Sequence, residues 1–271
     1  MTQRVIQWIN QRLTFGHPVA VATVISSSGS VPGKAGARLA MTSGDDRFGT
    51  VGGAGLEYQV ISVLDEMLEN GDGPGGDVIT YALFKDAKGY EAVPLDSLCG
   101  GRVTLSLEVI FPVPHLLLMG GGHVAASIAD FCGGMGWDYS VQDPRDDYAD
   151  NEAYPDAREL HAGSVTDFFE GENKDTLSRF THIYLLGHDW KEDQDRFTNL
   201  IKLLAGEGPI IGVIGSQAKW QDFTKLGLEA GSSQAVLDKI NCPIGLPIGA
   251  ESPEEIAIAV IAEIIKQQRL Q

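Results

Sequence analysis

The pattern of hydrophobic and polar residues changes near the middle of this chain. Residues 103–110 alternate Val and Leu with Thr, Ser and Glu, which predicts a strand that is buried on one face. Residues 19–25 are apolar and β-branched, and residues 78–84 alternate, so both predict strands as well. Helical spacing of apolar residues predicts helices over 3–13 and 56–69. The first half should therefore be a small β-rich α/β domain.

After the segment Phe111-Pro-Val-Pro114 the pattern becomes an alternation of strands and helices. Two prolines in four residues favour a linker there, because proline lacks a backbone donor and extends its predecessor. The expected strands are 115–119, 139–142, 182–186 and 210–214, and the expected helices are 124–135, 192–204 and one that begins after Ser252. Such alternation predicts a parallel sheet with right-handed crossovers. The expected domains are 1–110 and 115–271, the second being Rossmann-like.

The most informative stretch is the glycine-rich turn after the strand at 115–119. Gly120, Gly122 and Ala125 fit the G-x-G-x-x-G/A pattern, in which glycines allow a tight turn and close approach of a pyrophosphate. His123 lies in the same turn, at the start of a helix whose free N–H groups attract anions. Asp143 ends the next strand at the spacing of a ribose-binding acid. The alternative is a structural turn that binds nothing.

Two later turns repeat this geometry at the ends of predicted strands. Gly187-His188 follows one strand, and His188 is a candidate because open α/β sheets bind ligands at the carboxyl ends of their strands. Gly215-Ser216 follows the last strand, where Ser216 could cap a helix and contact a phosphate. Earlier glycine runs between residues 29 and 55 fit either an anion-binding concavity or tight turns.

Composition narrows the classes of partner. A formal charge of −17 argues against nucleic acid and against an anionic membrane surface. We expect no transmembrane helix, because no apolar stretch reaches about 18 residues, and no signal peptide. Three cysteines without a C-x-x-C pair fit neither a disulfide framework nor common zinc patterns, which favours a cytoplasmic protein. Cys132 and Cys242 are expected to be structural.

Cys99 is the cysteine with a possible chemical role. It precedes Gly100 and Gly101, which leave steric access, and Arg102 nearby could favour the thiolate. A thiolate is a soft donor suited to a metal or to sulfur transfer. The alternative for an isolated cysteine is a small buried hydrophobic residue.

Six segments form one combined pattern along the chain: Ser28-Gly-Ser-Val-Pro32, Gly49-Thr-Val-Gly-Gly-Ala-Gly-Leu-Glu57, Cys99-Gly-Gly101, the glycine-turn unit that runs to Asp143-Pro-Arg145, Ile211-Gly-Val-Ile-Gly-Ser216, and residues 242–255. Together they resemble the xanthine dehydrogenase accessory factor (XdhC/CoxI) family, whose members mature molybdenum hydroxylases. The resemblance covers nearly the whole chain. Two departures stand out, namely Ala54 in place of a third glycine and Gln217-Ala-Lys219 in place of arginines.

The resemblance implies a cofactor-binding chaperone rather than a turnover enzyme. The implied ligand is molybdenum cofactor of the molybdopterin type, and the implied role is to support its sulfuration and its insertion into an apo molybdenum hydroxylase. A cysteine desulfurase would supply the sulfur, and a homodimer is expected. By the same resemblance Cys99 would contact the cofactor or its metal, with Gly52, Gly53 and Glu57 shaping the pocket.

Two other classes of function remain open from the sequence. One is an NAD-dependent oxidoreductase, because the glycine turn and Asp143 serve NAD(P) or another dinucleotide equally well. Tyr81 and Lys85 have the Tyr-x-x-x-Lys spacing of short-chain dehydrogenases, but they precede the nucleotide unit in a strand-like run, so we interpret the match as chance. The other is a non-catalytic protein that senses nucleotides.

Overall fold

The computed structural model describes residues 2–44, 46–70, 75–83, 92–95 and 100–269 of the 271-residue chain. The described chain divides into two compact units, one ending at Pro112 and the other beginning at Val113. This division falls inside the segment 111–114, where two prolines remove backbone donors and disfavour continuous pairing. We call the two parts unit 1 and unit 2 and describe each by itself.

The described residues of unit 1 form a six-stranded sheet in the order β3-β2-β1-β6-β4-β5. Neighbouring strands are antiparallel except for the parallel pair β4–β5. The strands are β1 (Val19–Gly29), β2 (Arg38–Met41), β3 (Arg47–Gly49), β4 (Gly76–Ala82), β5 (Val93–Pro94) and β6 (Gly101–Ile110). The strands predicted at 19–25, 78–84 and 103–110 are confirmed as β1, β4 and β6, whereas the shorter β2, β3 and β5 were not predicted.

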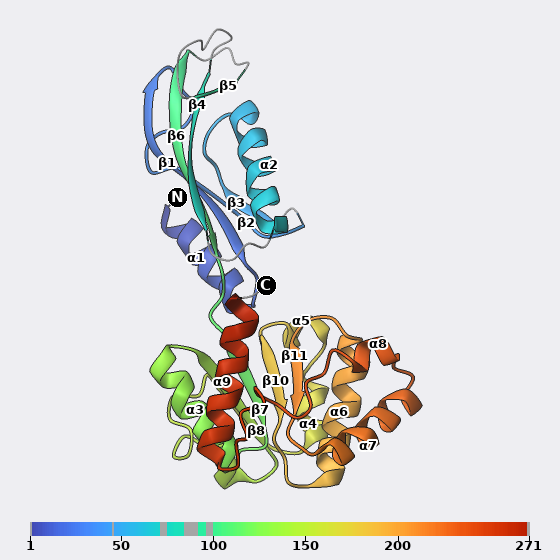
Figure 1. Cartoon of the computed structure of the whole chain (residues 1–271). Helices are drawn as coiled ribbons and strands as arrows, with labels where there is room; N and C mark the ends of the chain where they lie inside the picture. Colours follow the sequence, from blue (N-terminus) through green and yellow to red (C-terminus); the bar gives the residue numbers. More distant parts are fainter. Residues whose placement is uncertain (1, 45, 71–74, 84–91, 96–99, 270–271) are drawn as a thin grey trace. The chain divides into compact units, whose positions relative to one another are not determined.

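Two helices, α1 (Thr2–Thr14) and α2 (Ala54–Asn70), pack on opposite faces of this sheet (Figure 1). Successive side chains of a strand point to opposite faces, so one strand can serve both helices. Ala22 of β1 belongs to the hydrophobic core that includes α2, whereas Val21 packs in the smaller cluster with α1. Both helices were predicted, and the structure confirms them with ends extended by one or two residues.

Unit 2 contains a sheet of five parallel strands in the order β11-β10-β7-β8-β9. The strands are β7 (His115–Met119), β8 (Asp138–Asp143), β9 (Glu159–Ala162), β10 (His182–Leu185) and β11 (Ile210–Val213). The helices are α3 (His123–Met135), α4 (Val165–Glu170), α5 (Lys174–Leu177), α6 (Trp190–Leu204), α7 (Gln217–Glu229), α8 (Gln234–Leu237) and α9 (Pro253–Arg269), with a short 3-10 turn η1 (Asp146–Tyr148). This arrangement confirms the Rossmann-like fold class expected from the sequence.

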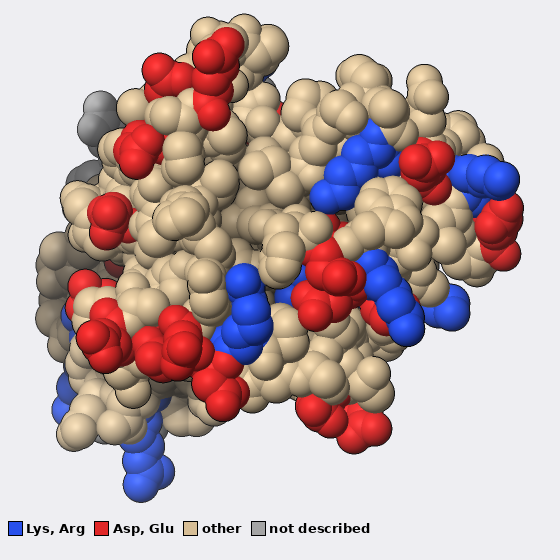
Figure 2. Space-filling model, turned by 90° about the horizontal axis from the view of Figure 1, so that it is seen from below, with Lys and Arg blue, Asp and Glu red and all other residues tan. Residues whose placement is uncertain are grey.

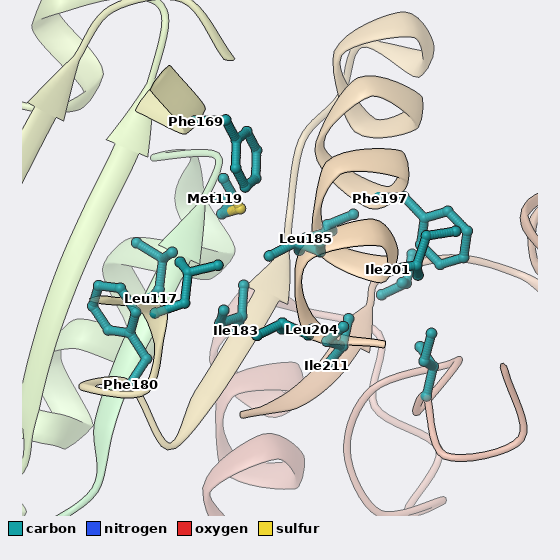
Figure 3. Close-up of a cluster of buried hydrophobic side chains, with 14 of the residues drawn as sticks. Leu117, Met119, Phe169, Phe180, Ile183, Leu185, Phe197, Ile201, Leu204 and Ile211 are labelled. Carbon is teal, nitrogen blue, oxygen red and sulfur yellow. The ribbon is translucent and has the colours of Figure 1, made fainter. Parts of the chain in front are cut away.

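Helices cover both faces of the parallel sheet of unit 2. On one face Leu117 and Met119 of β7 pack with Leu185 of β10 and with Phe197 and Ile201 of α6 (Figure 3). The alternate residues of β7 point to the other face and pack in a separate core with α3 and α9. Because both faces are buried, β7 is apolar along its whole length after His115. That continuous run is why the strand could be predicted from sequence.

The last helix begins as the sequence predicted. Ser252 caps α9 by accepting a hydrogen bond from the backbone N–H of Glu255 at 3.2 Å, and Pro253 occupies the first helical position. Among the described residues no helix combines the length and the apolar character that crossing a bilayer requires.

Candidate functional site

The glycine turn after β7 contains three glycines with different surroundings. Gly120 has φ +119, and a side chain there would lie 2.7 Å from the backbone nitrogen of Gly187. A Cβ on Gly121 would overlap the backbone carbonyl of Tyr148. Gly122, which precedes α3, has open space where its side chain would be. Gly122 is therefore the position of the turn with room beside its backbone, and the approach of a phosphate there stays a prediction.

Asp143 at the end of β8 holds this turn by a hydrogen bond to its backbone. Its side chain is buried, with the residue 1% exposed. One carboxylate oxygen, Oδ2, accepts from the backbone N–H of Gly121 at 2.8 Å and from Arg145 Nη2 at 2.8 Å. The other oxygen, Oδ1, accepts from Arg145 N at 3.0 Å and Nε at 2.8 Å. Burial opposes ionisation, but these donors outweigh it, so the pKa of Asp143 lies below its ordinary value.

Arg145 and Tyr148 lie at the edge of the turn, and neither was predicted to have a role. The Arg145 guanidinium stacks on the Tyr148 ring with its carbon 3.5 Å from the ring centre. Both oxygens of Asp143 are thus already engaged by protein donors. The geometry gives Asp143 a positioning role for the glycine turn, and its contact with a ribose stays a prediction. The adjacency of Asp143-Pro-Arg145 in the sequence was the signal for this pair.

The turns after β10 and β11 lie at the same carboxyl edge of the sheet. His188 is exposed and follows Gly187, which contacts Gly120 across the neighbouring strands β7 and β10. From β7 the strands are added toward one edge of the sheet (β8, β9), and from β10 they are added toward the other edge (β11). Open α/β sheets bind ligands at such a reversal of strand order, which here lies between β7 and β10. Ser216 caps α7 by accepting from Lys219 N at 3.3 Å, as predicted, and Gly215 packs on the Lys219 side chain. His123 is exposed at the start of α3.

A buried polar network lies beneath Gly187 and was not predicted. Arg196 of α6 is fully buried and donates to Gln142 at 3.0 Å and to Asp193 at 3.1 Å. Asp193 also accepts from Lys219 Nζ at 2.9 Å. A Cβ on Gly187 would lie 2.5 Å from Arg196 Nη1, so the network packs directly against this turn. Asp193, Arg196 and the apolar Phe197 share a helix face at spacings of three and four, which was the sequence signal.

Figure 2 shows unit 2 from the side of these turns. Lys and Arg side chains lie beside a central, slightly hollowed area of uncharged residues, and Asp and Glu side chains are interspersed among them. The face has no continuous basic patch. An anion bound at this edge would therefore depend on backbone N–H groups, such as those at the start of α3, more than on side-chain charge.

In unit 1 the second glycine motif forms the loop that begins α2. Gly52 and Gly53 have positive φ values of 100 and 58, and a Cβ on Gly52 would lie 2.6 Å from the Gly33 Cα. Thr50 Oγ1 donates to Glu57 at 2.9 Å and accepts from Gly52 N at 3.0 Å. Close packing of two chain segments thus explains why glycine occupies these positions. Glu57 ties the loop to the first turn of the helix.

The structure brings the Ser28–Pro32 motif against Gly100 and Gly101. Ser30 N donates to the Gly100 carbonyl at 3.1 Å, and a Cβ on Gly101 would lie 2.6 Å from Val31. A Cβ on Gly53 would in turn lie 2.7 Å from the Pro32 ring. Three motifs that are distant in sequence therefore meet at one end of unit 1. Cys99, the predicted catalytic and metal-binding residue, lies outside the described residues.

The remaining candidates occupy structural positions. Cys132 is buried in α3 and burial raises the pKa of its thiol to about 12, while burial also raises the pKa of Cys242. Tyr81 is buried in β4, and burial raises the pKa of its hydroxyl; Lys85 lies outside the described residues. Among the described residues no three His, Cys, Asp or Glu side chains form a metal-binding group.

Comparison with protein families matches both units. A family described as the XdhC Rossmann domain matches residues 116–264, and one described as the XdhC and CoxI family matches residues 13–82. The uncharacterised protein YqeB of Escherichia coli (strain K12) is 30% identical over 255 residues, which cover 92% of this chain and 43% of YqeB.

Two further similar proteins have names that refer to xanthine dehydrogenase. A probable xanthine dehydrogenase subunit of Bacillus subtilis (strain 168) is 31% identical over 166 residues, which cover 60% of this chain and 46% of that protein. The chain thus spans less than half the length of the curated relatives from Escherichia coli and Bacillus subtilis. The crystal structure of a xanthine dehydrogenase from Bacillus halodurans aligns over 98% of this chain and 96% of that chain, with 19% identity and a TM-score of 0.49.

Proposed function

The chain belongs to the XdhC and CoxI family, and from this membership we propose that it is an accessory factor in the maturation of a molybdenum hydroxylase. The observation that carries the proposal is the meeting of three family-like motifs at one end of unit 1. Ser28–Pro32 contacts both the Gly52–Gly53 loop and Gly100–Gly101 through backbone approaches that only glycine permits. The segments by which the chain resembles the family therefore lie side by side in unit 1.

We propose that this end of unit 1 binds molybdenum cofactor. When bound, the cofactor supplies a metal held by a pterin dithiolene that can exchange an oxo for a sulfido ligand. A Cβ on Gly100 would meet no described atom within 4 Å, so this position would leave room for the flat pterin. Gly101 would let the chain pack closely against the Ser28–Pro32 motif. The Cys99 thiolate would be the soft donor toward the metal, and Glu57 would hold the Gly52–Gly53 loop.

The Rossmann unit would bind a nucleotide, either NAD(P), another dinucleotide or the nucleotide of an extended pterin cofactor. The open space at Gly122 fits a phosphate against the start of α3, with His123 beside it. His188, Gly215 and Ser216 would border the same edge of the sheet from the neighbouring strands. Asp143 would act mainly by holding the turn through the Gly121 N–H.

We propose that the partners are an apo molybdenum hydroxylase, which receives the cofactor, and a cysteine desulfurase, which supplies the sulfur. The proposal includes a homodimer and a cytoplasmic location. The name of the Bacillus subtilis relative supports a hydroxylase partner, since that relative is named as part of a xanthine dehydrogenase. The chain would then be a carrier that binds and passes on the cofactor rather than an enzyme that turns over a substrate.

The test is to identify what purifies with the chain from cells that make molybdopterin. The bound material is oxidised and assayed for fluorescent pterin, and in parallel for nicotinamide nucleotides. We expect pterin with the wild type and with the control variants Cys132→Ser and Cys242→Ser, and its loss with Cys99→Ser. Retention of equal pterin by Cys99→Ser would remove Cys99 from the site, and nicotinamide nucleotide without pterin would favour an oxidoreductase instead.

A further inference from the structure

Unit 1 contains a groove that none of the candidate roles above explains. It has a volume of about 420 Å³ and is open to solvent. This volume lies within the usual range for small-molecule pockets, about 300–1,000 Å³. The groove is lined by Ser26, Ser27, Ser28, Thr80, Ala92, Arg102 and Thr104. Six of the seven described lining residues therefore carry hydrogen-bonding side chains, and most come from three neighbouring strands, β1, β6 and β4.

An irregularity in β1 places Ser26 and Ser28 on the face of the groove. The register between β1 and β6 shifts between Val24 and Ser26, so that Ser26 pairs with Thr104 and Ser28 pairs with Arg102. Residues directly opposite one another point to the same face of a sheet. Without the shift, Ile25 would lie opposite Thr104 and the serines at 26 and 28 would point to the other face. Such bulges re-aim side chains and are frequent beside binding sites.

Within the described part of unit 1, α1 covers one end of the face that carries the groove. Val19 and Val21 at the start of β1 pack against α1, whereas the residues of β1 from Ile25 onward are exposed. The larger helix α2 packs on the opposite face, against residues such as Val103. The strands therefore hold the hydroxyl side chains in a fixed, solvent-accessible row. Thr80 and Thr104 fall in this row, with their hydroxyls 3.0 Å apart.

The chemistry of the lining residues favours an anion with several oxygen atoms. Among the described residues that line the groove, Arg102 carries a charge. A guanidinium offers a planar set of donors that matches phosphate, and hydroxyl groups can donate to the remaining oxygens. Ala92 is the one aliphatic side chain among the same described lining residues. The rigid strands also reduce the entropy cost of binding.

The groove adjoins the site proposed for the cofactor. Ser28 begins the Ser28–Pro32 motif, Arg102 directly follows Gly101, and the pair Ser28–Arg102 is next in register to Gly29–Gly101. We propose that this groove is the phosphate-binding subsite of unit 1 and holds the phosphate monoester of a pterin ligand. The inference rests on the proposed function for the identity of the pterin, and the phosphate chemistry can be tested without it.

The experiment is a titration of the purified chain followed by backbone amide NMR. The three probes are a pterin monophosphate, the same pterin without its phosphate, and inorganic phosphate. We expect the pterin monophosphate to shift the amide signals of Ser28, Arg102 and Thr104 and to bind at least about 10-fold more tightly than the dephosphorylated pterin. Inorganic phosphate should shift the same signals at higher concentration, which separates the phosphate contact from the pterin contact.

Variants test the named residues. Arg102→Gln should weaken binding of the pterin monophosphate by about 10-fold or more and remove the response to inorganic phosphate, since a charge-assisted contact is lost. Ser28→Ala, at an exposed position, should weaken binding several-fold with the fold intact. Ser106→Ala is the matched control, because Ser106 lies on the same face of β6 outside the groove, and it should bind as the wild type does.

Three results would overturn the inference. They are signals that shift elsewhere than in the groove, equal affinity for the phosphorylated and dephosphorylated pterin, and wild-type affinity in a folded Arg102→Gln protein. A chain that retains pterin in cells but shows any of these would keep the proposed function and lose only this subsite. A groove that binds phosphate in a chain that carries no pterin would keep the phosphate subsite and contradict the proposed function.

Discussion

The glycine turn of unit 2 offers a matched pair of substitutions, Gly121→Ala and Gly122→Ala. The two residues are adjacent, and each change adds one methyl group. At Gly121 the new Cβ would overlap the carbonyl oxygen of Tyr148 and lie 2.9 Å from its carbonyl carbon. At Gly122 it would meet no atom within 4 Å. We therefore expect Gly121→Ala to damage the fold and Gly122→Ala to leave it intact.

The size of the first effect follows from the contact. Carbon atoms pack at about 3.5 Å or more, so the Tyr148 backbone must move by about 0.6 Å, and further to clear its oxygen. Gly121 does not have a positive φ, so the cost is steric rather than conformational. The segment cannot yield freely, because Arg145 ties it to buried Asp143. Overpacking of this kind costs about 1–3 kcal/mol, and the rigid backbone contact places Gly121→Ala near the upper end.

The second effect should be small in stability and large in binding. Gly122 precedes α3 in an extended conformation that alanine can adopt, so the free energy of unfolding should change by less than about 1 kcal/mol. A methyl group there would nevertheless block the approach of a phosphate to the backbone. We expect Gly122→Ala to lose nucleotide binding and to keep the fold.

The assay is urea unfolding followed by tryptophan fluorescence, with calorimetric titration of nucleotides on the folded proteins. Trp137, Trp190 and Trp220 are in unit 2 and only Trp8 is in unit 1, so the signal reports mainly the unit under test. Equal midpoints for Gly121→Ala and wild type would refute the packing argument. Undiminished nucleotide binding by Gly122→Ala would show that the turn is not the phosphate site.

Three further predictions concern buried ionisable side chains, namely His115, Asp143 and Asp193. Burial lowers the pKa of His115 to about 4, so between pH 6.5 and pH 5 this side chain takes up a proton only in the unfolded chain. The free energy of unfolding should therefore drop by about 2 kcal/mol over that range. In urea unfolding, His115→Gln should remove most of this dependence of stability on pH. Asp143→Asn should cost about 1–2 kcal/mol at pH 7, and its deficit should shrink as the pH falls through the lowered pKa of the wild-type carboxyl, below about 4. Asp193→Asn should cost about 3–5 kcal/mol because it removes the buried counter-charge 3.1 Å from Arg196 and leaves that guanidinium with Glu192, 3.7 Å away. Exposed Asp195→Asn should cost less than about 0.5 kcal/mol, and comparable losses for the two variants would contradict the network.

Sequence reasoning identified the site elements that depend on neighbours along the chain. The apolar run of β7, the Gly120–Gly122 turn and the start of α3 all follow from local rules of periodicity, φ angles and capping. The caps at Ser216 and Ser252 were predictable for the same reason, since a cap bonds a backbone group three residues away. Short elements such as β9 and α5 escaped prediction, because four residues are too few to show a hydrophobic periodicity.

The roles of individual site residues were decided by contacts between distant segments. The spacing of Asp143 suggested a ribose contact, but only the fold shows its carboxylate buried between Gly121 and Arg145. The glycines at 52 and 53 looked like a ligand loop, and the structure shows that close backbone packing already requires Gly52. Sequence spacing specifies which residue types are present, whereas burial and pairing determine which of them a ligand can reach.

The groove of unit 1 shows the same division most clearly. The run Ser26-Ser27-Ser28 determines that hydroxyl groups lie at the end of β1, and the residue types alone allow no more than that. Their face is set by the register shift opposite β6, which depends on pairing with residues about 80 positions away. The sequence by itself determined the family, most of the longer elements and the glycine turn. The tertiary structure determined the groove and the partners of Asp143, because both arise from long-range packing that no local pattern encodes.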